Sequence, residues 1–139
     1  MTIVDMLRHN AATWPNETAL VEVNPEMQEN RNVTWREYDL VEATDDEQYR
    51  REMTWQVFNE QSSRFANLLL SRGVRKDDKV AILLYNCIEW LPIYFGVLKT
   101  GATVVPLNFR YSSDEIDYCI NKSDADILIF GPEFIGRVE

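Results

Sequence analysis

The residue types that most often perform catalysis are sparse in this chain and do not form catalytic patterns. The single histidine, His9, has no serine or cysteine at a motif spacing, so a packed or surface histidine is a better interpretation than a catalytic base. Cys87 and Cys119 show neither a CxxC spacing nor a cluster of histidines, which argues against a zinc site and against a redox pair. We therefore expect two reduced, buried thiols.

Glycines and aromatic residues also lack the spacings of ligand sites. Phosphate binding in an α/β protein usually requires a glycine-rich loop before a helix, and the five glycines form neither GxGxxG nor GxxxxGK[ST]. Acidic residues occur as exposed charge runs, such as residues 45–47, and no pair suggests acid/base catalysis. Trp90, Tyr94 and Phe95 have helical spacing in an apolar segment, which favours core packing over a ligand-stacking box. The residues alone predict no catalytic residue and no metal site.

Composition limits the partners of the chain. Its 139 residues, 45% of them hydrophobic, suffice for one core. The net charge of -9 argues against nucleic-acid and anionic-membrane partners, which require clustered Lys and Arg. No apolar run approaches the roughly 20 residues that span a bilayer, and no signal-peptide pattern opens the sequence. We expect a cytoplasmic protein with no transmembrane segment.

Residues 1–52 predict a helix followed by a hairpin. Helical spacing covers residues 3–14, and strand spacing covers residues 18–23. A turn signal then leads to residues 33–42, which suit a strand better than a helix start. The sequence of residues 33–39 is echoed at residues 53–59, either as a short duplication or by coincidence.

Residues 53–139 predict helices alternating with parallel strands. A long helix is expected from its cap at Thr54 to Gly73, and a continuous apolar run at residues 79–84 indicates a central strand. The next helix, residues 88–98, is apolar nearly all round and is expected to be buried, with Asn86 as its cap and Gly101 at its end.

The alternation then repeats to the end of the chain. A strand is expected at residues 103–105, a helix capped by Ser112 or Ser113 through Ile120, and a strand at residues 126–130. The prediction is an α/β fold: one unit over residues 1–139, with an open, mainly parallel sheet, flanking helices and a small mixed β-hairpin region in front.

Three stretches carry a family resemblance. Residues 98–108, LKTGATVVPLN, resemble the second core motif of the adenylate-forming, AMP-binding enzyme superfamily, and residues 53–58, MTWQVF, are similar to its first. Between them, residues 74–90 look like the family's VKKGDRVAILLPNCPEF segment, with Asp78 taken as the replacement of its glycine. AMP-forming acyl-CoA synthetases are the branch that the chain resembles most, while residues 24–52 depart from the family's shorter connection.

The resemblance implies that this chain is the N-terminal part of a two-step ligase. A carboxylic or fatty acid would react with ATP to give an acyl-adenylate, and coenzyme A (CoA) would then take the acyl group, with Mg²⁺ as the metal. The family's phosphate loop, its aspartate and arginine motifs and its lid lysine all come later than Glu139, so the isolated chain is expected to be inactive. Arg110 matches the position where a basic residue approaches the CoA phosphates in some synthetases; a surface arginine after a strand is the other interpretation.

Two alternatives give the chain a role of its own. One is a stand-alone interaction or regulatory module derived from such a ligase, which docks onto a full-length enzyme through an exposed sheet edge. The other is a structural fragment that forms a homodimer through the same edge. If the chain is instead the N-terminal part of a ligase, its partner is the remainder of the ligase chain.

Overall fold

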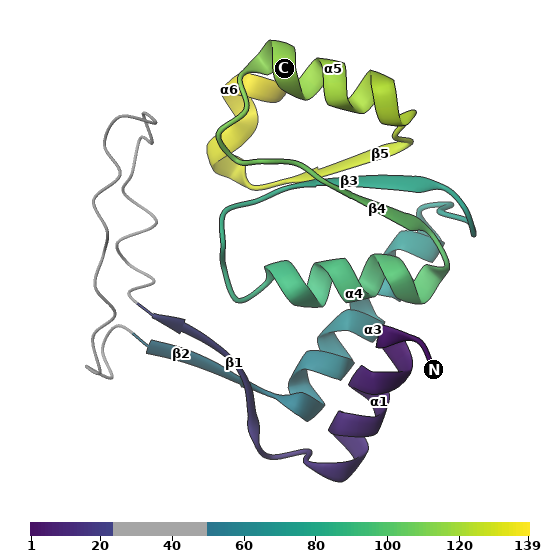
Figure 1. Cartoon of the computed structure of the whole chain (residues 1–139), viewed down its shortest axis with the longest axis vertical. Helices are drawn as coiled ribbons and strands as arrows, with labels where there is room; N and C mark the ends of the chain where they lie inside the picture. The colour runs from purple at the N-terminus through teal and green to yellow at the C-terminus, as the bar shows by residue number, and fades with distance from the viewer. Residues whose placement is uncertain (24–49) are drawn as a thin grey trace.

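Helices cover both faces of a short parallel sheet in the computed structural model, which describes residues 1–23 and 50–139 (Figure 1). The strand predicted at residues 33–42 lies outside the described residues. So does the first copy of the sequence echo at residues 33–39.

The chain opens with α1 (Ile3–Thr13), which begins with a complete capping box. The Thr2 hydroxyl accepts a hydrogen bond from the backbone N–H of Asp5, and the Asp5 carboxylate accepts one from the backbone N–H of Thr2. These two bonds satisfy backbone donors that a helix start otherwise leaves unpaired. The helix packs through Leu7, which is buried against Met53, Phe58 and Ile88.

The antiparallel pair consists of β1 (Thr18–Val23) and β2 (Arg50–Thr54). The sequence did not predict β2, because the residues RREMT are too polar to read as a strand. Two features stabilise it: the backbone pairing with β1, and a 3.0 Å ion pair between Arg51 and the buried Glu22. Tertiary pairing therefore overrides a weak local preference.

The three predicted strands form a parallel sheet, with the strand predicted at residues 79–84 in the centre. Its strands are β3 (Lys79–Leu83), β4 (Thr103–Pro106) and β5 (Ile127–Phe130), in the order β4-β3-β5. The central position of β3 explains why its apolar run has no polar alternation, since a strand covered on both faces buries every side chain. The fully buried residues of β3 are Val80, Ala81, Ile82 and Leu83.

Two core clusters, one on each face, hold the layers together. Val80 and Ile82 point to the face covered by α3 (Trp55–Ser71) and α4 (Trp90–Thr100). Ala81 and Leu83 point to the opposite face, covered by α5 (Ser113–Ser123). Figure 1 shows the sheet between these layers, with α1 and the strand pair beyond α3 and α4. The predicted fold class is confirmed.

Helix boundaries agree with the predictions at every capping signal but one. Thr54 caps α3, and Gly101 ends α4 with a left-handed φ of 83°. Ser112 caps α5 and forms a capping box with Glu115. Asn86, however, does not cap α4, which begins only at Trp90 without any side-chain cap. A turn occupies residues 88 and 89, so the predicted cap precedes the helix by a full turn.

The helix α4 is less buried than its apolar sequence predicts. Only Pro92, Gly96 and Val97 are buried, and its other residues are half-buried. Gly96 lies directly on α3, where an added Cβ would stand 2.8 Å from Phe65 Cδ1 and 3.0 Å from the carbonyl oxygen of Ser62. The glycine therefore allows the close approach of the two helices.

The turn before β3 corrects one detail of the family resemblance. Asp77, and not Asp78, has a left-handed φ of 72°, a conformation that favours glycine. The Asp78 carboxylate instead accepts a 2.7 Å hydrogen bond from the backbone N–H of Arg75. The glycine position of the family segment therefore falls on Asp77.

The chain continues after β5 through two short elements. A single 3₁₀ turn, η2 (Pro132–Phe134), follows Gly131, and α6 (Ile135–Val138) follows it directly. Phe134 is buried under the α5 face of the sheet. These elements bring Arg137 to the carboxyl end of the sheet.

Candidate functional site

The carboxyl ends of the three parallel strands meet at one edge of the sheet. Tyr85 follows β3, Phe109 follows β4 and Phe134 follows β5. The ring of Tyr85 lies 5.2 Å from that of Phe109 and 5.0 Å from that of Phe134, measured between centroids. These contacts join the three loops. In an open α/β sheet this is the edge where ligands bind.

Arg110 lies exposed in the loop after β4. The loop begins as an extension of the sheet, because the backbone N–H of Leu107 donates to the carbonyl of Ile82 at 2.8 Å. The side-chain oxygen of Asn108 then accepts a hydrogen bond from the backbone N–H of Arg110 at 2.9 Å. The backbone carbonyl of Asn108 accepts one from the backbone N–H of Tyr111 at 3.0 Å. The structure therefore places the predicted residue Arg110 on an ordered turn at the carboxyl edge.

A second arginine, which the sequence analysis missed, reaches the same loop. Arg137 Nη1 donates to the carbonyl oxygens of Phe109 at 2.9 Å and Tyr111 at 3.4 Å. Its guanidinium carbon lies 5.6 Å from the centroid of Phe134, and that of Arg110 lies 5.5 Å from the centroid of Phe109. Two guanidinium groups thus occupy one edge, an arrangement that suits an anionic group.

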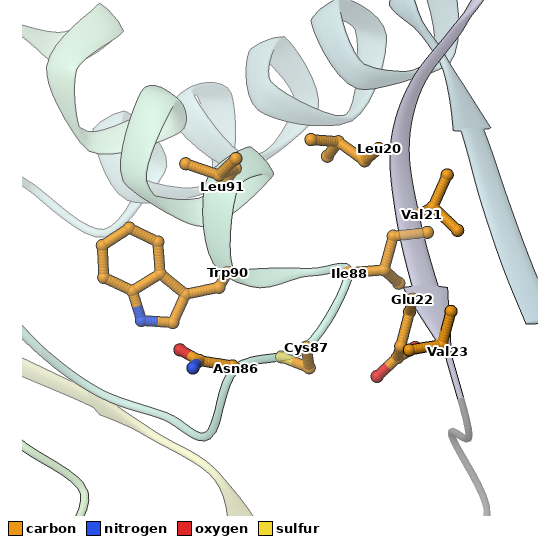
Figure 2. Close-up of a pocket in the computed structure, with 9 residues that line it drawn as sticks. All are labelled: Leu20, Val21, Glu22, Val23, Asn86, Cys87, Ile88, Trp90 and Leu91. Atoms are coloured by element: carbon orange, nitrogen blue, oxygen red, sulfur yellow. The ribbon is translucent and has the colours of Figure 1, made fainter. Parts of the chain in front are cut away.

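A pocket of about 390 Å³ opens beside this edge, between β1 and the segment of residues 86–91 (Figure 2). Glu22 forms part of its wall and is bridged to Glu89 by Arg51, with distances of 3.0 Å and 2.6 Å. The bridge fastens the strand pair to the turn before α4. The pocket is lined by Leu20, Val21, Glu22, Val23, Asn86, Cys87, Ile88, Trp90 and Leu91.

The titratable groups of the pocket suit a structural role. Burial raises the pKa of Glu22, against the opposing effect of Arg51. Burial also opposes ionisation of Glu89, but the hydrogen bond from Arg51 lowers the pKa of Glu89 overall. Burial, with the Glu89 charge, raises the pKa of Cys87 to about 11, so its thiol stays protonated at neutral pH.

The other residues singled out in the sequence lie apart from this edge or in ordinary packing. His9 is exposed and makes an edge contact with Trp14. Both cysteines are free thiols, and each is half-buried rather than buried. Phe95 packs against Phe58 with ring centroids 5.2 Å apart, whereas Trp90 stacks on Tyr94 and lines the pocket.

Lys99 is a half-buried cation that connects two helices. Its Nζ donates to the Asn59 carbonyl at 3.0 Å, to the Asn59 side chain at 2.7 Å and to the Ser63 hydroxyl at 2.9 Å. Burial lowers the pKa of Lys99 to about 8, with a smaller contribution from the charge of Arg8. The lysine therefore fixes α4 to α3 through neutral acceptors.

Two features that metal and phosphate sites often have are missing from residues 1–23 and 50–139. No group of three or more His, Cys, Asp or Glu residues could hold a metal ion there. Gly131 is followed by a single 3₁₀ turn, which is too short to direct a row of N–H groups at a triphosphate. Among the same residues, no helix is long and apolar enough to cross a bilayer.

Comparison with known proteins places these features in context. Residues 7–138 match the model of the AMP-binding enzyme family. Over 76 residues the chain is 40% identical to the crotonobetaine/carnitine–CoA ligase of Salmonella paratyphi B. The match covers 55% of this chain and 15% of that ligase.

Solved structures agree with this match over nearly the whole chain. The N-terminal domain of FACL13 from Mycobacterium tuberculosis superposes with a TM-score of 0.75 at 26% identity, over 98% of this chain and 28% of that one. An anthranilate CoA ligase bound to anthranoyl-AMP gives a TM-score of 0.76 at 26% identity, over 99% of this chain and 22% of that one. The chain thus spans less than a third of each of these relatives.

Proposed function

The chain belongs to the AMP-binding enzyme family, and from that premise we propose that it is the N-terminal part of an ATP-dependent, AMP-forming acyl-CoA synthetase. The reaction of the whole enzyme is the activation of a small carboxylic acid as an acyl-adenylate, followed by transfer of the acyl group to CoA. The observation that carries the proposal is the α4–β4 unit, which has the LKTGATVVPLN motif of this family, in a fold that CoA ligases share.

The described residues take one part in this reaction, the binding of CoA. Arg110 contacts a phosphate of CoA at the carboxyl edge of the sheet, where a guanidinium can donate two hydrogen bonds to a phosphate. ATP, Mg²⁺ and the acid are held by the remainder of the ligase chain, which is the partner of this segment. The whole protein acts in the cytoplasm.

The isolated chain has no ligase activity in this proposal. The test is an assay of pyrophosphate release with ATP, Mg²⁺, CoA and a panel of aliphatic and aromatic acids. We expect no acid-dependent release from the 139-residue chain and acid-dependent release from the longer polypeptide that contains it. Turnover by the short chain alone would overturn the assignment of catalysis to the remainder.

The role of Arg110 is tested in the longer polypeptide. Arg110→Ala is expected to raise the KM for CoA by about tenfold or more, because a charge-assisted contact to phosphate is lost, while the KM for ATP stays the same. Arg75→Met, at an exposed arginine before β3, is the matched control for a lost positive charge. Equal KM values for CoA in the two variants would contradict the role of Arg110.

A further inference from the structure

Arg137 contacts the Arg110 loop on both sides of Arg110. Its Nη1 donates to the carbonyl of Phe109, the residue before Arg110, and to the carbonyl of Tyr111, the residue after it. We propose that Arg137 is a positioning residue that fixes this loop, so that the Arg110 guanidinium is presented to a phosphate group of CoA. The inference rests on the proposed function of Arg110 and extends it.

The rest of the loop is already bonded from within. The Asn108 side chain and carbonyl accept from the N–H groups of Arg110 and Tyr111, and Leu107 is bonded to the sheet. The carbonyls of Phe109 and Tyr111 point the other way, toward α6. Because one guanidinium bonds both carbonyls, the donor from α6 helps to fix which way these two peptide groups face.

Packing holds Arg137 in place for this task. Its side chain is half-buried, and its guanidinium lies over the ring of Phe134, which is itself buried. Phe134 in turn contacts Tyr85, and Tyr85 contacts Phe109. The loop is therefore held from two sides, by the hydrogen bonds from Arg137 and by the ring of Tyr85 against Phe109. A loop held at several points loses less freedom when its ligand binds.

Arg137 spends its printed hydrogen bonds on the loop and not on an acid. No carboxylate of the described residues lies within ion-pair distance of it, and its two hydrogen bonds go to neutral carbonyls. An arginine whose purpose is structural charge balance normally faces an acid. The contacts of Arg137 with the loop carbonyls therefore indicate that it positions the loop.

The experiment measures steady-state kinetics of the longer polypeptide with Arg137→Met, Arg137→Lys, Arg110→Ala and the double variant Arg110→Ala/Arg137→Met. We expect Arg137→Met to raise the KM for CoA about tenfold, with kcat and the KM for ATP within about twofold of the starting protein, because only the presentation of Arg110 is lost. Arg137→Lys, which keeps a long donor, restores most of the affinity. Arg75→Met is the charge control.

The double variant separates positioning from direct attraction. If Arg137 acts through Arg110, adding Arg137→Met to Arg110→Ala changes the KM for CoA by less than about twofold. Additive effects would show that Arg137 attracts the ligand independently and would overturn the positioning role. Parallel losses in every kinetic constant with a lower Tm would overturn it as well, in favour of a purely structural role.

The two proposals fail in different ways. If Arg110→Ala raises the KM for CoA and Arg137→Met does not, the positioning role is wrong and the proposed function of Arg110 stands. If Arg110→Ala has no effect, the proposed function of Arg110 is wrong, and the role of Arg137 falls with it. Should Arg137→Met not fold, Arg137→Gln removes the charge and the reach of the donor at the same position, and the same criteria apply.

Discussion

At the scale of single residues, Asp77 holds a conformation that suits glycine. Its φ of 72° places the Cβ against the following carbonyl, a contact that costs a residue with a side chain about 1 kcal/mol. We therefore expect Asp77→Gly to raise the free energy of unfolding by up to about 1 kcal/mol, reduced by the greater freedom of glycine in the unfolded chain. Urea unfolding of the two proteins measures this change in the free energy of unfolding.

The neighbouring aspartate is the matched control for Asp77. Asp78→Gly removes the carboxylate that accepts from the backbone N–H of Arg75, so it should lower the free energy of unfolding. If Asp78→Gly were the stabilising change and Asp77→Gly the destabilising one, our placement of the family's glycine position on Asp77 would be wrong.

Lys99 predicts a pH dependence of stability. Its pKa in the folded protein, about 8, is below the ordinary value of 10.5. Between these two pH values the unfolded chain binds more protons than the folded one, so the free energy of unfolding rises with pH there. Lys99→Met lacks this contribution. The measurement is urea unfolding of both proteins at about pH 7.5 and about pH 10, roughly the ends of this window. The free energy of unfolding of the Lys99 protein, relative to that of Lys99→Met, should be higher at the upper pH. The same difference at both pH values would contradict the prediction.

The arginines show what sequence reasoning can find at the residue scale. Arg110 was predicted because it stands just after a family motif that also ends a strand. Arg137 had no such signal. Its partners are backbone carbonyls 26 and 28 residues earlier in the chain, and any residue type supplies a carbonyl, so no side-chain pattern marks the contact.

At the scale of elements, three helices begin at a side-chain cap: α1 at Thr2, α3 at Thr54 and α5 at Ser112. Ser112→Ala should lower the free energy of unfolding by about 1 kcal/mol, because the backbone N–H of Glu115 loses its acceptor and the capping box is broken. Ser113→Ala, one residue further along, is the control and should have little effect. Thermal unfolding followed by circular dichroism compares the two; equal Tm values would contradict the assigned cap.

The misplaced cap at Asn86 and the unpredicted strand β2 share a physical cause. Asn86 has the right residue type for a cap, with Glu89 three residues on, but Glu89 is engaged by Arg51 from another strand. Likewise β2 is stabilised by β1 and by the Arg51–Glu22 pair, both distant in sequence. The parallel strands were predictable because apolar runs between helices are local signals. Contacts between residues far apart in the chain leave no local signal in the sequence.

At the scale of the whole molecule, β4 and β5 form the two edges of the sheet that the structure describes. Within the described residues, β4 and β5 each have one neighbour, so each offers a row of unpaired backbone groups to another strand. We expect the isolated chain to self-associate, with an apparent mass that rises with concentration in analytical ultracentrifugation. A concentration-independent monomer would indicate that residues of the chain itself cover both edges.

We propose that this chain works as one part of a larger CoA ligase, and the size of the native polypeptide tests this proposal most directly. An antibody raised against the chain would be used to probe a lysate of the source cells. We predict a band several times larger than the 16.3 kDa of the chain itself. A band at 16.3 kDa alone would contradict the claim and would favour a stand-alone interaction module.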